Sequence, residues 1–279
     1  MKPHDAELVP AGVRQAVVHG LHDGKVSQGP DWLAEETPVA LVCNGISQAV
    51  MMASPADLDD FALGFGLTEG WFRGPHELYG VDVVSVCQGI ELHLDVASAC
   101  VHRLKERRRS MAGRTGCGLC GTDSLAQVRQ ALPQAPDVRV PAAALARAQR
   151  ELRHLQARQQ LTGATHAAAW CDLQGAVLLL REDVGRHNAL DKLVGAMVRA
   201  GHDASRGFVA ITSRASFEMV QKAALAGAGV LAAVSAPTAL AVDTALACNL
   251  ALAGFVRGDG CVAYTFAERL GLTGQEHGH

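Results

Sequence analysis

The sequence predicts an α/β protein in which a smaller N-terminal α+β domain precedes a larger α/β domain. Its 279 residues are long for one hydrophobic core and comfortable for two. In the second half, strand patterns alternate with helix patterns through short links, which is typical of a sheet packed against helices. Between the halves, a basic run gives way to glycines. We therefore place the domains at 1–106 and 123–279, with a basic, glycine-rich loop at 107–122 between them.

The N-terminal region is expected to begin with a tail and an edge strand over roughly its first thirty residues. The dipeptide Asn44-Gly45 then predicts a hairpin turn. Ser54 is the expected cap of a helix, with Pro55 in the first helical position and apolar residues repeating at helical spacing from Leu58. The expected strands of this region are 39–42, 48–52, 81–86 and 90–96.

The second region begins with helix-forming residues from about 142 to 160. Further helices are expected at 190–198 and 217–225, each stopped by a glycine, and from Pro237 onward. The strands between these helices form the predicted sheet. They are expected at 167–171, 177–180, 208–212, 230–234, 252–256 and 262–266.

Composition excludes several classes of protein. A net charge of −3 gives the protein no overall positive electrostatic potential that would attract nucleic acid, so any anion-binding site must be formed by a local group of residues. The N-terminus lacks the apolar core of a signal peptide, and the uncharged run 223–242 is split by glycine, serine and proline. We expect a cytoplasmic protein with reduced thiols and with neither a nucleic-acid nor a membrane partner. Most of the scattered cysteines are expected to be small buried hydrophobic residues: Cys43, Cys87, Cys100, Cys171, Cys248 and Cys261.

Cys117 and Cys120 form a CxxC pair among four glycines. Such a pair is typical of half a zinc site, a dithiol redox centre or a sulfur carrier. A four-ligand zinc site would need a second CxxC or a Cys/His pair close to this one. The best remaining candidate ligand, His166, is isolated in the sequence, so we expect no metal. A thioredoxin-like motif would lie early, at a strand-to-helix turn, whereas this pair lies in mid-chain. The glycines favour a mobile loop whose thiols visit two partners.

A basic run, HRLKERRRS at 102–110, precedes the cysteine pair, and Arg114 is closer still. Positive charge favours the thiolate, which is the reactive form of cysteine. The run therefore indicates an activated thiol pair, with a solvated basic face as the alternative interpretation.

Polar residues cluster at the strand ends of the second region. In the stretch EDVGRHNALDK, residues 182–192, Asn188 is an expected helix cap and Asp191 an expected first-turn residue. Arginine, histidine and backbone N–H groups between a strand and a helix make a natural anion pocket. Because successive loops at the carboxyl ends of strands line one crevice, we expect a phosphate-bearing ligand there. The candidate binding residues are Thr165, His166, Arg186, His187, Ser213, Arg214 and Ser235.

Six blocks, in order, resemble the FdhD family of formate dehydrogenase accessory sulfurtransferases, from about residue 38 to 270. A lone CxxC would be a weak signal, whereas six linked blocks are highly specific. The blocks are GRTGCGLCG, LTGATHAAAW, REDVGRHNALDKL, SRASFEMVQKA, AVSAPTALAV and GFVRGDGCVAYT.

The resemblance implies that Cys117 accepts sulfur as a persulfide from a cysteine desulfurase, with Cys120 as the second cysteine of the pair. The sulfur then passes to the molybdenum (or tungsten) bis(molybdopterin guanine dinucleotide) cofactor before formate dehydrogenase receives it. GDP is the expected mimic of that cofactor. The alternative function is a non-catalytic chaperone that binds the cofactor and presents it.

The resemblance also implies a cytidine-deaminase-like α/β domain and a homodimer. It places a cofactor loop after a strand end. The family's loop can carry a second basic residue, whereas the loop of this sequence ends in Gly-Asp-Gly. The loop residues are Phe255, Val256, Arg257, Gly258, Asp259 and Gly260.

Overall fold

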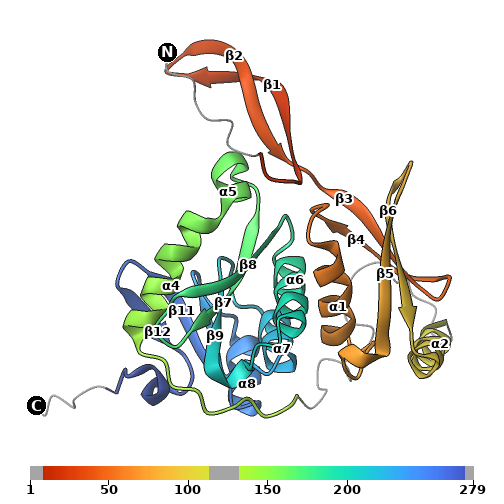
Figure 1. The fold of residues 1–279 in the computed structure, drawn as a ribbon. Helices are drawn as coiled ribbons and strands as arrows, with labels where there is room; N and C mark the ends of the chain where they lie inside the picture. Colours follow the sequence, from red (N-terminus) through yellow and green to blue (C-terminus); the bar gives the residue numbers. More distant parts are fainter. Residues whose placement is uncertain (1–8, 113–131, 274–279) are drawn as a thin grey trace, which may run out of the picture.

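A computed structural model describes residues 9–112 and 132–273 and arranges them as a small N-terminal α+β part beside a larger α/β part (Figure 1). The α/β class expected from the sequence is confirmed. Cys117 and Cys120 lie outside the described residues. Within the described ranges, no helix has the length and apolar character needed to cross a membrane.

The N-terminal part is a four-stranded sheet in the order β4-β3-β6-β5 with helices on one face. Large apolar side chains, including Phe61 of α1 and Leu41 and Leu92 of the sheet, are fully buried between the layers. The four expected strands are present. The elements are β3 (Thr37–Cys43), β4 (Ile46–Ala53), α1 (Leu58–Thr68), η1 (Pro75–Glu77), β5 (Leu78–Val86), β6 (Gly89–Val96) and α2 (Ser98–Ala112).

The first residues differ from the expected tail and edge strand. They form a separate hairpin in which β1 (Val13–His22) pairs with β2 (Lys25–Ala34) along its whole length. Asp23 and Gly24 both have positive φ, as the two central residues of a type I′ turn require. The dipeptide Asp23-Gly24 is therefore a hairpin signal that the sequence prediction did not include.

The expected helix start at Ser54 is also wrong. Helix α1 begins at Leu58, and the preceding Asp57 has a left-handed φ of 55°. Ser54 is fully buried instead, and its backbone N–H donates to the Asp183 carboxylate at 2.9 Å. The Asp183 carboxylate, distant in sequence, therefore binds the backbone at Ser54, where local capping rules predict the start of the helix.

The α/β part holds a six-stranded sheet in the order β12-β11-β10-β9-β7-β8, with β9, β10 and β11 parallel. Helices α6, α7 and α8 cover one face and α4 covers the other (Figure 1). The strands are β7 (His166–Asp172), β8 (Val177–Asp183), β9 (Gly207–Ile211), β10 (Val230–Ala233), β11 (Ala251–Arg257) and β12 (Gly260–Ala263). The helices are α4 (Ala142–Leu155), α5 (Ala157–Thr162), α6 (Arg186–Arg199), η2 (Ala204–Arg206), α7 (Phe217–Leu225), α8 (Ala239–Ala247) and η3 (Ala267–Leu270).

Three predicted boundaries in this part are wrong. The helix expected from about 142 to 160 breaks at Gln156. Strand β8 continues to Asp183, so Glu182 and Asp183 belong to the sheet and not to a loop. Strand β12 ends at Ala263, and Phe266 adopts a left-handed φ of 50°.

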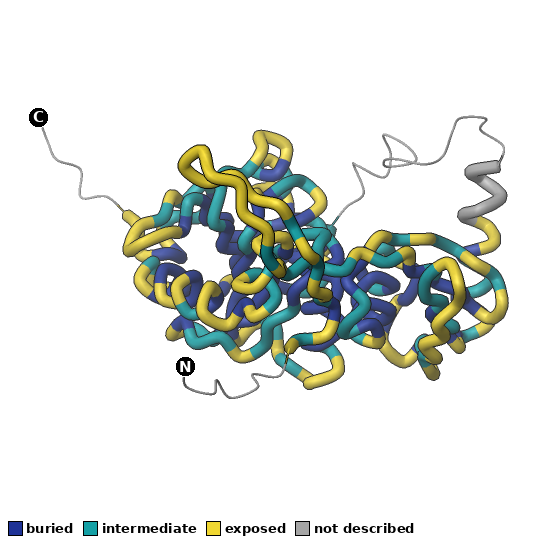
Figure 2. Tube along the Cα trace, turned by 90° about the horizontal axis from the view of Figure 1, so that it is seen from above, coloured by how far each residue is buried: buried dark blue, intermediate teal, exposed yellow. Residues whose placement is uncertain are grey.

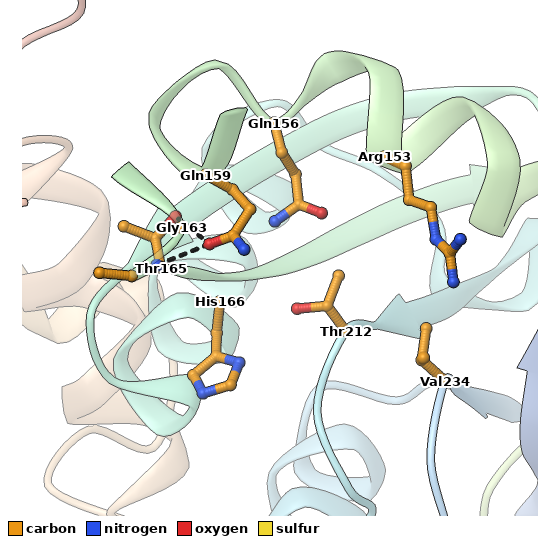
Figure 3. A pocket seen from close by; sticks show the side chains of 9 residues that line it. Arg153, Gln156, Gln159, Gly163, Thr165, His166, Thr212 and Val234 are labelled. Atoms are coloured by element: carbon orange, nitrogen blue, oxygen red, sulfur yellow. Dashed lines mark hydrogen bonds between the residues drawn. The ribbon is translucent and has the colours of Figure 1, made fainter. Parts of the chain in front are cut away.

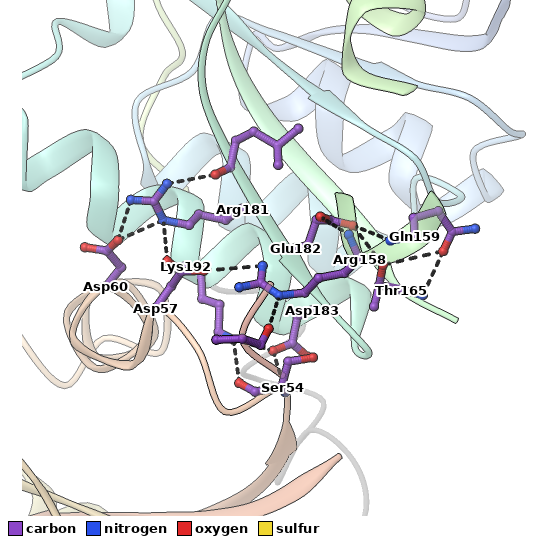
Figure 4. A network of polar contacts seen from close by, with 12 residues as sticks. Ser54, Asp57, Asp60, Arg158, Gln159, Thr165, Arg181, Glu182, Asp183 and Lys192 are labelled. Carbon is purple, nitrogen blue, oxygen red and sulfur yellow. Dashed lines mark hydrogen bonds and ion pairs between the residues drawn. The ribbon is translucent and has the colours of Figure 1, made fainter. Parts of the chain in front are cut away.

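The two parts pack directly against each other where α1 crosses α6. At this crossing, a Cβ on Gly64 would overlap the carbonyl oxygen of Asp191, and one on Gly195 would overlap that of Asp60. Beside the crossing, the fully buried Lys192 ammonium lies 2.6 Å from Asp183 and donates to the Ser54 carbonyl at 2.8 Å (Figure 4). Charges this deep are tolerated because they are paired and hydrogen-bonded.

Candidate functional site: one edge of the larger sheet

The predicted polar loops gather at one edge of the six-stranded sheet. Parallel strands β9, β10 and β11 all end there, and the antiparallel strand β7 begins there because Ala168 pairs with Ile211. Strand β8 ends at the same edge, since His166 pairs with Asp183. The topology therefore brings together the loops that carry the candidate residues. Their roles in binding a ligand stay a prediction.

A cavity of about 530 Å³ opens at this edge, between the α4–α5 segment and the ends of the strands (Figure 3). Of the predicted binding residues, Thr165 and His166 line it. Sequence analysis missed the other lining residues, which are Arg153, Gln156, Gln159, Gly163, Ala164, Thr212 and Val234. The volume falls within the range of small-molecule sites, roughly 300–1,000 Å³.

The helix break above this cavity is held by a buried carboxylate. Glu182, only 2% exposed, accepts the backbone N–H groups of Arg158 at 3.0 Å and Gln159 at 2.9 Å (Figure 4). It also accepts the hydroxyl of Thr165 at 2.9 Å. The carboxylate thereby satisfies the free donors at the start of α5, which fixes the turn at Gln156 over the cavity.

Side-chain amides give the cavity its polar character. Gln156 is 4% exposed, lines the cavity and has no hydrogen-bond partner for its Nε2 within the described structure. The Gln159 carbonyl oxygen accepts the Thr165 N–H at 2.8 Å, which leaves its NH₂ group as the remaining donor. The cavity therefore offers uncharged donors to a ligand that carries acceptors.

Two helical turns before Gln156, Gln149 attaches α4 to the sheet. Its amide donates to the Ile211 and Ala232 carbonyls, each at 3.2 Å, at the ends of β9 and β10. Gln149, Arg153 and Gln156 follow the i, i+4, i+7 spacing of one helix face. Glutamines on the sheet-facing side of an otherwise amphipathic helix were the sequence signal that could have indicated this site.

A second, cationic patch lies at the N-terminus of α6. Gly185 is the cap residue and provides no side-chain hydrogen bond, while Arg186 and His187 occupy the first turn, where acidic residues are usual. Neither Arg186 Nε nor His187 Nε2 has a hydrogen-bond partner within the described residues. Backbone N–H groups at a helix start, beside the Arg186 guanidinium and the His187 imidazole, favour an anion at this position.

The two histidines near this patch favour their neutral forms. Burial lowers the pKa of His166 and of His187, and the neighbouring Arg186 guanidinium lowers both further. Glu218 opposes the effect at His187, but its carboxylate is 3.7 Å away, too long for a hydrogen bond. Each imidazole can therefore donate and accept one hydrogen bond near neutral pH.

Two predictions for this stretch are wrong. Asn188 does not cap α6; its amide donates to the Met52 carbonyl at 2.7 Å and so joins the two parts of the molecule. Asp191 lies in the second turn of α6 and not in the first, and it is 1% exposed and pairs with Lys222 at 2.9 Å. The charged residues of 182–192 are thus mostly structural, and a role of Arg186 and His187 in ligand binding stays a prediction.

The stretch predicted as a cofactor loop is mostly strand: Phe255, Val256 and Arg257 end β11 and Gly260 begins β12, so only Gly258 and Asp259 form the turn at this sheet edge. Phe255 has a left-handed φ of 50°, and the Arg257 guanidinium lies 5.2 Å from the centre of its ring. Asp259, where the sequence departs from the family pattern, pairs with Arg150 of α4, which also donates to the Gly258 carbonyl at 3.0 Å. Helix α4 therefore contacts both the cavity and this loop.

The described cysteines agree in most cases with the expected buried, inert role. Cys43, Cys100, Cys171 and Cys248 are buried, and burial raises the pKa of Cys43 to about 12. Cys87 differs, because it is exposed at the turn between β5 and β6. Among the described residues, no group of three or more His, Cys, Asp or Glu side chains is arranged to hold a metal ion.

These features define an α/β protein with a candidate ligand site at one sheet edge, where a cavity lined by side-chain amides and Arg153 lies beside cationic loops. The chain belongs to the FdhD/NarQ family, whose model matches residues 34–271. The resemblance seen in the sequence blocks is therefore confirmed, and the matched range includes both cysteines of the CxxC pair.

Individual relatives agree. The chain is 57% identical over 271 residues to the sulfur carrier protein FdhD of Variovorax paradoxus, covering 97% of this chain and 95% of the relative. It is 56% identical to the protein of the same name from Bordetella petrii, covering 87% of each. A crystal structure of a putative formate dehydrogenase accessory protein from Desulfotalea psychrophila matches with a TM-score of 0.74 at 22% identity, covering 93% of this chain and 99% of that one. That last likeness shows the fold.

Proposed function

We propose that this protein is a sulfur carrier that serves the maturation of formate dehydrogenase. The observation that carries the proposal is the 57% identity, over nearly the whole chain, to a relative named sulfur carrier protein FdhD. The ligand-binding sheet edge supports it, because a carrier must hold the acceptor of its sulfur. We assign the persulfide to Cys117, the first cysteine of the pair, and a cysteine desulfurase as donor.

The chemistry needs two thiols close together. The Cys117 thiolate attacks the outer sulfur of the desulfurase persulfide, the S–S bond breaks, and the desulfurase thiolate leaves. Attack by the Cys120 thiolate on the inner sulfur of the Cys117 persulfide then releases the outer sulfur as hydrosulfide to the metal. A disulfide remains, which a cellular thiol reduces. Alternatively, Cys120 assists as a second carrier.

The acceptor in this proposal is the molybdenum or tungsten bis(molybdopterin guanine dinucleotide) cofactor, held as a client at the sheet edge. Arg186, Arg214 and Arg257 supply positive charge and donors for its phosphates, and the neutral His187 imidazole supplies one further donor. The amide-lined cavity supplies donors for the carbonyl of a base, and GDP is the probe for both. The family resemblance further supports a cytidine-deaminase-like α/β part, a cytoplasmic location and a homodimer.

The test is to incubate the protein with a cysteine desulfurase and cysteine, and then to measure peptide masses after trypsin treatment. We expect a gain of one sulfur atom on the peptide that contains Cys117 and none on the peptide that contains Cys87. Cys87 is the matched control because it is an exposed thiol without the CxxC setting. An unmodified Cys117 peptide would refute the proposal.

A cofactor-binding chaperone is the second candidate. The described residues that line the cavity lie between Arg153 and Val234, and their amide, guanidinium and imidazole groups can bind a ligand without transferring sulfur to it. A Cys117→Ala strain discriminates between the two functions. A sulfur carrier predicts loss of formate dehydrogenase activity in that strain, whereas a chaperone predicts that activity is kept.

A further inference from the structure

The N-terminal hairpin, residues 13–34, stands away from both sheets, and we refer to it as the arm (Figure 1). Within the described chain, β1 and β2 pair only with each other. The arm is fixed at its base, where Arg158 donates to the Ala11 carbonyl at 2.7 Å and the Glu35 N–H to the Gly12 carbonyl at 2.8 Å. An isolated two-stranded hairpin is marginally stable in water, so a packing partner for it is expected.

The two faces of the arm differ in charge. Residues paired across an antiparallel ribbon share a face, and the pairs Val17–Pro30 and Leu21–Val26 lie on the same one. Apart from His19, that face has no titratable side chain, and its large apolar residues are Val13, Val17, Leu21, Val26, Pro30 and Trp32. The opposite face holds the charged residues Arg14, Lys25 and Asp31.

The apolar face of the arm is uncovered. Val17 is 67% exposed, Leu21 is 72% exposed and Val26 is 77% exposed. The view from above shows most of the arm exposed to solvent (Figure 2). Apolar side chains gathered on one uncharged face in this way indicate an interaction surface.

The same chain has a second uncovered apolar surface next to the arm. Helix α1 packs on the face of the N-terminal sheet that carries Val39 and Leu41. Val50 and Met52 of the edge strand β4 point to the other face, since they pair with Ala40 and Pro38. They are 61% and 46% exposed, so this face also lacks a cover.

We propose that the arm docks on a second copy of this chain, with its apolar face on the outer surface of β3 and β4 around Val50 and Met52, and that the two copies exchange arms around a twofold axis. The proposal rests on the self-association proposed above and identifies its surface. The arm and the β3–β4 surface complement each other, and both are present on every copy, as an interface between identical subunits requires.

Area favours a second copy over an unrelated partner. With a rise of about 3.3 Å per residue and a strand spacing of about 4.8 Å, one face of the arm measures roughly 33 by 10 Å. One arm on one partner surface then buries about 700 Å² in total, below the roughly 1,200 Å² of a specific interface. Two exchanged arms bury about twice as much, which lies within the specific range.

Sedimentation velocity on the full-length protein in a thiol reductant tests the proposal. The wild type is expected to be a dimer, and the double variant Leu21→Asp/Val26→Asp a monomer, or at least tenfold weaker in dimerisation, because two carboxylates would be buried in an apolar contact. Ser27→Asp is the matched control, since it adds a carboxylate beside Val26 on the opposite face. The control is expected to dimerise like the wild type.

Val50→Asp tests the receiving surface and is also expected to weaken the dimer. Because these side chains are exposed, the variants are expected to keep the thermal unfolding midpoint of the wild type. A double variant that dimerises normally would overturn the arm contact and leave self-association intact. If only Val50→Asp dimerises normally, the assigned receiving surface is wrong. A monomeric wild type would overturn both self-association and the arm contact.

Discussion

At the scale of single residues, Gln156 is the clearest addition to the candidate site. Its buried amide has a donor without a partner among the described residues, and an unpaired buried donor costs free energy unless a ligand satisfies it. We therefore expect Gln156→Ala to weaken GDP binding roughly tenfold, the effect of one lost hydrogen bond. Isothermal titration calorimetry measures this, with Gln174→Ala as the control because Gln174 is exposed in the turn between β7 and β8. Equal GDP affinity in Gln156→Ala and wild type would exclude Gln156 from base recognition.

The histidines of the site link stability to pH. His187 has a pKa below its ordinary value of 6.5 because burial and Arg186 disfavour its charged form. The unfolded chain therefore binds more protons than the folded chain in this range. The free energy of unfolding should be highest above pH 6.5 and decrease as pH falls from 6.5 through the lower pKa of the folded state.

A His187→Gln variant should lose part of that pH dependence, because glutamine does not titrate. Urea unfolding at a series of pH values below neutrality measures the slope. His22→Gln is the control, since His22 is exposed at the tip of the arm. A slope in His187→Gln as steep as that of the wild type would show that His187 does not cause it.

At the scale of helices and strands, the sequence predicted what local signals determine. Asn44-Gly45 predicted a hairpin, and the alternating helices and strands of the second half were found in order. The break at Gln156 could not be predicted, because it depends on Glu182, which lies far along the chain and binds the start of α5. Ser54 was misassigned for the same reason, since Asp183 binds its backbone. Local propensity gives way where a buried charge from another element satisfies the backbone.

The residues of the candidate site were also predicted only in part. His166, Arg186 and His187 were found because charged and polar residues at strand ends stand out in an apolar sequence. Gln156 and Gln149 were not predicted because glutamine on a helix is ordinary; their helical spacing on the sheet-facing side was the available signal, and the structure shows that both are buried. The sequence therefore predicted the cationic residues at this sheet edge, and the structure added the cavity lined by side-chain amides and Arg153.

At the scale of the whole molecule, the contact between α1 and α6 fixes how the N-terminal part is placed on the larger α/β part. The crossing is close because Gly195 has no side chain, and a Cβ there would overlap the Asp60 carbonyl oxygen. Beside it, Asp60 also pairs with Arg181 of β8, at 2.7 Å. Helix α1 therefore cannot move away from α6 at this crossing without breaking the Asp60–Arg181 ion pair, which joins the two parts.

Gly195→Ala is consequently expected to destabilise the protein by about 2 kcal/mol, as overpacking does in a close-packed interior. Helix propensity alone predicts the opposite sign, because alanine in a free helix is more favourable than glycine by about 1 kcal/mol. Urea unfolding measures the difference. Gly80→Ala is the control, since a Cβ on Gly80 meets no atom within 4 Å. A Gly195→Ala protein more stable than the wild type would show that the helices can separate, and that the two parts of the molecule are not held in one arrangement by this crossing.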